Sequence, residues 1–269
     1  MDETFKQRVD RLEKSGYLKN YGAMAMNMCA AFWWSAQPEG KEATILQNGT
    51  VCFVNTGSRH IGITCDHVFQ GYLDDKRQHD NVECQFGNNR FDPEKYRIDR
   101  SPESAYDLAT FDVPEVFVSA SLRHYHHNAL KWPPDRVVES DVLLYGGFPQ
   151  VLRTPKGGQV EFPFQWFVSR VSSVDPDRIV LDPVLETLYW PGHEAEQINT
   201  KWWGQSGGPV YRAVDASPDV SVVDRLELVG FIYQQWGTTM ILARSAFLVD
   251  ANGKIHQPPD VETSPDIEP

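Results

Sequence analysis

Three residue types that cooperate in nucleophilic catalysis stand far apart in this chain. The serine among them, Ser206, lies in residues 204–209, which read Gly-Gln-Ser-Gly-Gly-Pro. Glycines let such a turn take positive φ, which exposes the serine hydroxyl and turns backbone N–H groups inward, where they can hold an oxyanion. The same residue types also favour ordinary surface turns. A serine nucleophile therefore requires, in addition, a base and a group that orients the base.

Candidates for both partners lie upstream, each beside a strand-like segment. Residues 61–68 form a β-branched, alternating run that carries His67 near its end, and Asp107 opens the apolar, alternating run 107–113. Each residue has a structural alternative, because a histidine after a strand is often structural and an aspartate before one is often a turn residue or cap. Taken together, a histidine base, an aspartate orienter and a serine nucleophile would form a catalytic triad.

The order His67, Asp107, Ser206 resembles that of the trypsin-like serine peptidases of the chymotrypsin fold, whose signatures are Thr-Ala-Ala-His, Asp-Leu-Ala and Gly-Asp-Ser-Gly-Gly-Pro. The chain looks most like the compact bacterial members, over roughly residues 45–250. The resemblance implies an all-β fold of two six-stranded antiparallel barrels with the site between them, and no cofactor. It also implies that the N–H groups of Gly204 and Ser206 form the oxyanion hole.

Three departures from the family pattern have physical consequences. The family's Thr-Ala-Ala-His is here Thr-Cys-Asp-His at 64–67, and Val68 replaces a cysteine, so the disulfide that braces the histidine loop is missing. Gln205 stands where secreted members have an aspartate that pairs with a newly cut N-terminus. None of these changes removes a triad group. Gln205 predicts a protein that needs no N-terminal processing, with its amide donating to a backbone carbonyl and accepting from an N–H of the turn.

The resemblance also places a specificity pocket. The predicted base of this pocket is Thr200, with Lys201 beside it. One wall is formed by Tyr233, Gln234 and Gln235, and Met240 narrows the pocket. None of these positions is acidic, so a preference for Arg or Lys in this pocket is not expected. Lys201 would favour an acidic substrate side chain if it pointed inward, whereas a lysine on a loop is commonly solvated.

The length and composition allow one two-barrel domain with a sizeable core, since the chain has 269 residues, 41% hydrophobic and 12% aromatic. We divide it into a helical segment 1–22, a first barrel 23–130 with His67 and Asp107, a second barrel 131–250 with Ser206, and a disordered acidic, proline-rich tail 251–269. Strands are expected at 82–86, 137–145, 162–174 and 179–181, and most of 70–106 is expected to be surface loop. Phe5, Val9 and Leu12 recur at helical spacing, with Gly16 as a stop.

The net charge and the N-terminal segment limit the classes of binding partner that we expect. A net charge of -12 without a Lys/Arg cluster argues against nucleic acid. The opening segment lacks the pattern of a secretory signal, and the apolar stretch 23–34 is too short to span a bilayer. We therefore expect a cytoplasmic protein that acts on a protein or peptide and does not bind membranes. An inhibitory or partner-docking role for the N-terminal segment stays open.

Two clusters of side chains suggest other chemistry. The cysteines, expected to be four reduced thiols, are Cys29, Cys52, Cys65 and Cys84. Cys65 is close enough to His67 to be a rival nucleophile, but a buried core thiol is the favoured interpretation. His124, His126 and His127 lie in a polar connector and are interpreted as solvated loop histidines, so no metal site is expected.

The sequence therefore predicts a serine endopeptidase that works through an acyl-enzyme. Two alternatives remain open. The first is a protease scaffold that has lost its activity and serves as a protein-interaction module, because a fold alone does not establish a function. The second is an esterase that uses the same triad on small acyl substrates.

Overall fold

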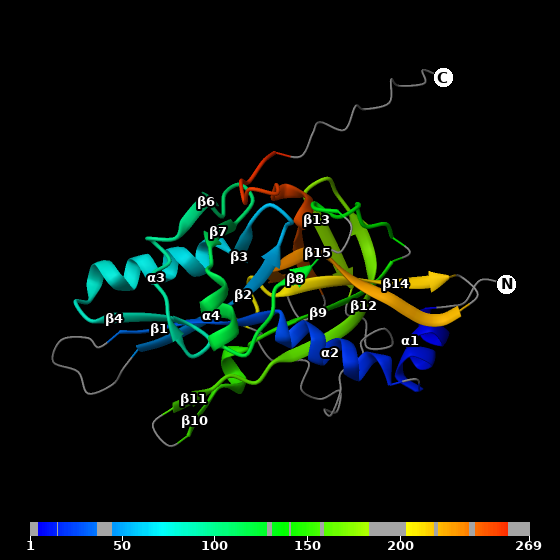
Figure 1. The fold of residues 1–269 in the computed structure, drawn as a ribbon, viewed down its shortest axis with the longest axis horizontal. Coiled ribbons are helices and arrows are strands. Elements are labelled where there is room, and N and C mark those ends of the chain that lie inside the picture. Colours follow the sequence, from blue (N-terminus) through cyan, green and yellow to red (C-terminus); the bar gives the residue numbers. More distant parts are fainter. Residues whose placement is uncertain are drawn as a thin grey trace.

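The computed structural model describes residues 5–14, 16–36, 45–127, 131–139, 141–156, 159–182, 203–217, 220–236 and 240–257 (Figure 1). Two helices open the chain, α1 (Phe5–Lys14) and α2 (Tyr17–Asn27). A mostly antiparallel sheet and a closed barrel follow, the first in the N-terminal half and the second in the C-terminal half. None of the helices described here combines the length and the apolar composition that crossing a bilayer requires.

The C-terminal half forms the predicted six-stranded barrel, closed in the order β12-β13-β16-β15-β14-β9. Its strands are β9 (Val142–Gly147), β12 (Gln165–Val174), β13 (Arg178–Asp182), β14 (Pro209–Ser217), β15 (Val220–Trp236) and β16 (Met240–Ser245). A 3-10 turn η1 (Gln150–Leu152) and a hairpin of β10 (Thr154–Lys156) and β11 (Gln159–Glu161) lie between β9 and β12, and η3 (Ala246–Leu248) follows β16. Inward side chains such as Leu143, Tyr145 and Phe167 fill the barrel, as the alternating pattern of these strands requires.

The N-terminal half corrects the expectation of a second closed six-stranded barrel. It is an eight-stranded sheet in the order β5-β4-β1-β2-β3-β7-β6, with β8 paired to β2 outside this path, and its ends are not joined. The strands are β1 (Cys29–Ala36), β2 (Ile45–Asn55), β3 (His60–Thr64), β4 (Val82–Phe86), β5 (Asn89–Arg90), β6 (Arg97–Ser101), β7 (Leu108–Asp112) and β8 (His126–His127). Helices α3 (Asp66–Gln78) and α4 (Glu115–Ala120) accompany them.

Aromatic side chains pack around the segment that joins the two end strands of this sheet, β5 and β6. Phe91 follows β5 and Tyr96 precedes β6, and their rings stack at 5.1 Å between the two sheet ends. Phe117 of α4 packs edge-on against Phe91 at 5.5 Å. Burial of apolar surface therefore holds this segment and α4 together.

Helix α3 was not predicted, because residues from 70 onward were expected to be loop. Its buried side chains include Val68, Phe69, Tyr72 and Leu73, which lie on one helical face. Phe69 contacts the core ring of Phe111 at 5.3 Å. The helix is therefore fixed to the sheet by an apolar stripe although its remaining residues are polar.

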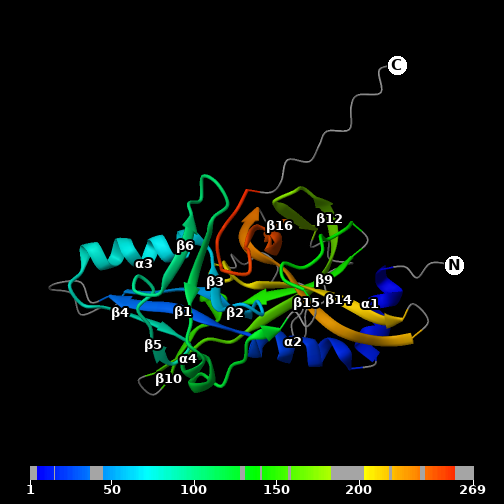
Figure 2. The same cartoon turned by 45° about the horizontal axis from the view of Figure 1, so that its top comes forward.

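The N-terminal segment contains two helices where one was predicted. Gly16 has φ 75°, and the chain turns there between α1 and α2. Both helices lie beside the closed barrel in the two views (Figures 1 and 2). Leu12 is 1% exposed and Tyr21 is 6% exposed, and both belong to the core cluster that joins the two halves. The segment is therefore packed as part of the fold.

Two further expectations are wrong. His126, expected to be a solvated loop residue, lies in β8 and is 2% exposed, and its Nε2 accepts from the Leu228 N–H at 3.2 Å. The start of the expected disordered tail is ordered, because Ile255 bridges to Val249 and the Gly253 carbonyl accepts from Thr110 Oγ1 at 2.6 Å. Residues 258–269 of that tail lie outside the described part of the chain.

Candidate active site

The register of β3 and β7 brings His67 and Asp107 together. The strands are antiparallel with Thr64 opposite Ala109, so the end of β3 and the start of β7 share one edge of the sheet. His67 lies just after the end of β3, in the first turn of α3. Asp107 comes one residue before the start of β7. A sequence separation of 40 residues is thereby reduced to direct contact.

Both carboxylate oxygens of Asp107 are occupied by His67. Oδ1 accepts from the His67 backbone N–H at 2.9 Å, and Oδ2 lies 2.7 Å from the ring Nδ1. A carboxylate can only accept, so Nδ1 carries the proton and the neutral ring keeps its lone pair on Nε2. Asp107 is 1% exposed, which shields this interaction from water. The aspartate therefore fixes both the position and the tautomer of the histidine.

Asp107 adopts a backbone conformation that most residues avoid. Its φ is 52°, one of two positive values among the described non-glycine residues. Aspartate tolerates this region better than most side chains, and its N–H donates to the Pro102 carbonyl at 3.1 Å. Strain of this kind costs of order 1–3 kcal/mol and persists where the surroundings hold it in place. Here it directs the carboxylate toward the start of α3.

Opposing influences set the pKa of His67. Burial lowers the pKa, but the hydrogen bond and the charge of Asp107 raise it by more, and the carboxylates of Glu103 and Asp66 add to the rise. The pKa of His67 therefore lies above its ordinary value of 6.5. The imidazolium is therefore more stable than that of an unperturbed histidine, which suits a base that must hold a proton during turnover.

An ion pair that the sequence did not reveal fixes the start of α3. Asp66 is 3% exposed and receives two hydrogen bonds from Arg100, both of 2.7 Å. Arg100 also donates to Gln70 at 2.8 Å and lies over the Phe69 ring at 5.3 Å. The residues of this pair are 34 positions apart, so no local pattern indicates it. It locks the turn that carries His67 to strand β6.

The glycine-rich turn has the geometry that its composition predicts. Gly204 and Gly207 have φ 96° and 85°. A Cβ on Gly204 would lie 2.5 Å from both Asn48 Nδ2 and the Phe148 carbonyl oxygen, and one on Gly207 would lie 2.1 Å from the Thr50 carbonyl oxygen. Positive φ and close approach both require glycine at these two positions.

Strand β2 holds this turn from the other half of the molecule. The Thr50 N–H donates to the Ser206 carbonyl at 2.8 Å, and Thr50 Oγ1 donates to the Gly204 carbonyl at 2.9 Å. The backbone N–H groups of Gly204 and Ser206 form no hydrogen bond with any residue that the structure describes. The turn therefore presents two unpaired donors beside the serine.

The predicted role of the Gln205 amide in holding the turn is wrong in its donor half. Gln205 is 2% exposed, and its Nε2 has no partner among the described residues. The carbonyls of the turn already have other donors, since Gly207 O accepts from Cys52 Sγ at 3.1 Å and Gln205 O accepts from the Gly208 N–H at 2.7 Å. The turn is stabilised by neighbouring strands rather than by the glutamine side chain.

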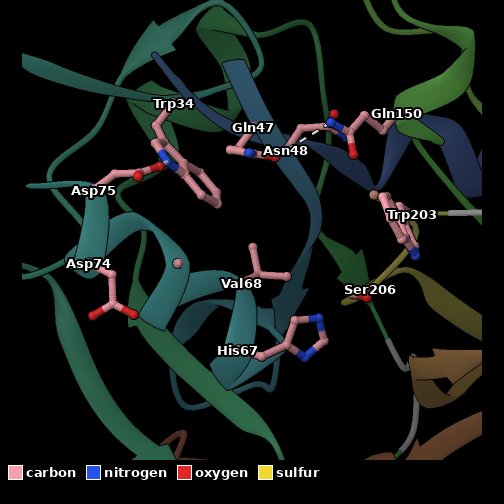
Figure 3. Close-up of a pocket in the computed structure, with 12 residues that line it drawn as sticks. Trp34, Gln47, Asn48, His67, Val68, Asp74, Asp75, Gln150, Trp203 and Ser206 are labelled. Atoms are coloured by element: carbon pink, nitrogen blue, oxygen red, sulfur yellow. Dashed lines mark hydrogen bonds between the residues drawn. The ribbon is translucent and has the colours of Figure 1, made fainter. Parts of the chain in front are cut away.

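His67 and Ser206 line one cavity of about 520 Å³ (Figure 3). The imidazole extends from α3 toward the turn that carries Ser206. Within the described residues, no hydrogen bond joins the Ser206 hydroxyl to the His67 ring. Such bonds are often long without substrate and tighten in the complex.

Apart from Gly204, which was predicted as part of the oxyanion hole, the other lining residues of the cavity were not predicted. They come from β1, β2, α3, η1 and the serine turn, and are Trp34, Gln47, Asn48, Val68, Gly71, Asp74, Asp75, Gln150, Trp203 and Gly204. Asp74 and Asp75 stand at the end away from Ser206 (Figure 3). Recognition of α3 as a helix is the signal that would have found part of this set, because Gly71, Asp74 and Asp75 follow His67 by four, seven and eight positions and so share its helical face.

None of the expected specificity residues that the structure describes lines this cavity. Thr200 and Lys201 are outside the described residues. Tyr233, Gln234, Gln235 and Met240 belong to β15 and β16 and do not line this cavity. The Tyr233 ring is covered by the guanidinium of Arg244, 4.1 Å from its centroid. The specificity pocket drawn from the family pattern stays a prediction.

One group of side chains in the described residues has the proximity of a metal site. Ligand atoms of Cys65, His67 and Asp107 lie within 4.8 Å of one another. Burial raises the pKa of Cys65 well above its ordinary value, and its thiol donates to the Ile232 carbonyl at 3.1 Å. A protonated, hydrogen-bonded thiol is a poor metal ligand. All four cysteines are free and buried.

Comparisons with known proteins give distant structural likenesses. The sequence matches no family model, and no curated protein matches it. The Rv3671c protease of M. tuberculosis in its active form is 15% identical, with a TM-score of 0.45, and the match covers 91% of this chain and 88% of that one.

Two further solved structures are similar at the same level. A serine endoprotease from Yersinia pestis is 11% identical with a TM-score of 0.43, covering 83% of this chain but 62% of that one. A structure described by the coupled folding and binding of the Sesbania mosaic virus VPg protein contains a chain that is 14% identical, with a TM-score of 0.44 and coverage of 84% and 95%. Similarities this distant leave the function to be inferred from the chemistry of the site.

Proposed function

We propose that this protein is a trypsin-like serine endopeptidase in which His67, Asp107 and Ser206 form the catalytic triad. The observation that carries the proposal is the double contact of Asp107 with His67 on the wall of a cavity that also contains Ser206. An oriented base, a serine in a positive-φ turn and two unpaired N–H groups are the parts that acyl transfer requires.

Each group has a defined part in the reaction. Ser206 Oγ attacks the peptide carbonyl carbon while its proton passes to His67 Nε2, and the Asp107 carboxylate stabilises the imidazolium. The carbonyl oxygen becomes an oxyanion that accepts from the Gly204 and Ser206 N–H groups. When the C–N bond breaks, the imidazolium gives its proton to the leaving amine. Water then repeats the sequence on the acyl-enzyme and releases the acid.

The protein is active as synthesised under this proposal. The position before the nucleophile is the neutral, buried Gln205, so an inserted N-terminal ammonium would have no charge partner there. An unpaired buried ammonium costs several kcal/mol. The observation that α1 and α2 are packed into the core supports the same conclusion, because their removal would expose apolar surface.

The second candidate is a scaffold that binds partners without catalysis, because a fold alone does not establish a function. Incubation with a peptide library, analysed by mass spectrometry, separates the candidates. A peptidase yields defined cleavage products that disappear in Ser206→Ala and persist in the control Ser172→Ala, an exposed serine of β12. Hydrolysis of small esters with no peptide cleaved supports the esterase, and no turnover of either substrate contradicts the proposal.

A further inference from the structure

The cavity beside the catalytic pair extends along one face of α3 (Figure 3). Its lining residues on this helix, after His67, are Val68, Gly71, Asp74 and Asp75. At 1.5 Å per residue, Asp75 lies about 12 Å along the helix axis from His67. The cavity therefore begins at the proposed reaction centre and ends at a carboxylate.

The proposed chemistry decides which part of a substrate meets this face. His67 must deliver a proton to the leaving amine, so the leaving group lies against the imidazole. The helix that carries His67 continues directly from that point. The residues that follow the cleaved bond therefore run along α3, within reach of Asp75 for a long side chain on the first or second of them.

Asp75 carries a negative charge that no described residue compensates. Its Oδ2 accepts from Trp34 Nε1 at 2.6 Å, and none of the described basic side chains forms an ion pair with it. Its neighbour Asp74 differs, because Arg77 and Gln70 donate to Asp74 Oδ1 at 3.0 Å and 2.7 Å. The indole holds the Asp75 carboxylate in place while leaving its charge available.

The walls suit the stem of a long cation. Trp34 and Trp203 both line the cavity, and Trp203 is 63% exposed, which is unusual for so large an apolar side chain. Aliphatic stems pack on indole rings, and a cation near a ring face gains cation–π attraction. A volume of about 520 Å³ is in the range of small-ligand sites.

An independent feature of the wall also indicates a ligand. Asn48 lines the cavity, is 8% exposed, and has an Oδ1 without a partner in the described residues, although its Nδ2 donates to the Phe148 carbonyl at 2.8 Å. A buried amide oxygen left unpaired costs about 1–3 kcal/mol. A substrate N–H at this wall would satisfy it.

We propose that this cavity binds a Lys or Arg side chain on the leaving-group side of the substrate, with Asp75 as its charge partner and the two indoles as its walls. This inference rests on the proposed peptidase function. It concerns the opposite side of the cleaved bond from the specificity pocket predicted at Thr200 and Lys201. The two predictions therefore concern different substrate residues.

Matched peptides test the proposal. The acyl side is kept constant, and the first or second residue after the cleaved bond is Lys, Gln or Glu. The kcat/KM value for the Lys peptide should exceed that for Gln by about fivefold, as expected for one partly exposed ion pair, and Glu should be the poorest. Asp75→Asn keeps an acceptor for Trp34 and should reduce the Lys-to-Gln ratio to about one. The control Asp80→Asn, an exposed carboxylate just beyond α3, should keep the ratio.

Charge reversal and binding make the test independent of turnover. Asp75→Lys should prefer the Glu peptide over the Lys peptide. The inactive variant Ser206→Ala should bind the Lys peptide more tightly than the Gln peptide. The change in indole fluorescence on titration with each peptide measures this binding. Equal kcat/KM for the three peptides in the active wild-type protein overturns the cavity assignment and leaves the peptidase proposal standing. If the wild-type protein cleaves none of the peptides but binding still prefers the Lys peptide, the peptidase proposal is refuted and the cation site stands. If binding does not distinguish the Lys peptide from the Gln peptide, the cation site is refuted.

Discussion

Asp107 holds His67 through both carboxylate oxygens, one on the backbone N–H and one on the ring Nδ1. The two contacts have separate consequences. The backbone contact ties the first turn of α3 to the start of β7, and the ring contact selects the tautomer. Because the side chain of Asp107 makes both contacts, a substitution that replaces one of its oxygens affects the position of His67 and its tautomer together.

Asp107→Asn should lower kcat/KM by about 10³–10⁴-fold, since an amide can donate to the ring and stabilise the wrong tautomer. The measurement is steady-state cleavage of the best library peptide. Asp112→Asn is the matched control, because Asp112 is the last residue of β7, the strand that directly follows Asp107, and pairs with Arg59 at the surface. A loss in Asp107→Asn no larger than in Asp112→Asn would show that Asp107 has only a structural part.

The activity should depend on one ionisation whose midpoint lies above pH 6.5, because Asp107, Glu103 and Asp66 raise the pKa of His67 beyond the effect of burial. The base must be neutral, so kcat/KM should be high above the midpoint and decline as the pH falls through it. Glu103→Gln removes one negative charge and should shift the midpoint to lower pH. A midpoint below 6.5, or a flat profile from pH 5 to 9, contradicts His67 as the base.

The ion pair at the start of α3 predicts a non-additive effect on stability. Arg100→Met leaves Asp66 buried without a partner and should lower the free energy of unfolding by about 3 kcal/mol. Addition of Asp66→Asn removes the unpaired charge and should restore part of the loss. Urea denaturation of the single and double variants measures the effect. Strictly additive losses would mean that the two side chains do not act as a pair.

Substitutions at two glycines with positive φ distinguish the effect of backbone strain on stability from the effect of the turn on activity. Gly204→Ala should abolish most activity, because the added Cβ would collide with Asn48 and with the Phe148 carbonyl. Gly57→Ala is the control, since Gly57 has φ 85° and open space around its Cβ position. It should cost about 1 kcal/mol in unfolding free energy while leaving kcat/KM unchanged. Equal activities of the two variants would argue against an oxyanion hole at Gly204.

Removal of the N-terminal helices should weaken the protein rather than activate it. A chain that starts near Gly22 lacks Leu12 and Tyr21, which are buried between the helices and the barrel. The expected result is a lower unfolding temperature and equal or lower peptidase activity. A large gain in activity on truncation would identify the segment as inhibitory.

Local patterns indicated several strands and the three residues that we propose as a triad. The strand 82–86 was predicted with the bounds of β4, and 179–181 lies within β13, because period-2 alternation is a property of neighbouring residues. The glycines of the serine turn indicated positive φ directly. The barrel of the second half was expected only because the order of the three residues resembles a known family.

What could not be predicted depends on distant contacts. Helix α3 is rich in polar residues, and its apolar stripe gains meaning only against Phe111 and the other rings of the sheet. The packing of Phe117 in α4 against Phe91 and Tyr96 likewise joins segments that are distant in the sequence. Because helix α3 was not predicted, the cavity along it was not predicted either, nor was the position of the Asp75 carboxylate in that cavity.

Labelling with a fluorophosphonate, followed by mass spectrometry of the proteolytic fragments, tests whether Ser206 is an activated nucleophile. We expect stoichiometric modification of the fragment that contains Ser206, no modification in Ser206→Ala, and a labelling rate lowered by orders of magnitude in His67→Ala. Folded protein that stays unlabelled, or label on another residue, would contradict the assignment of Ser206 as an activated nucleophile.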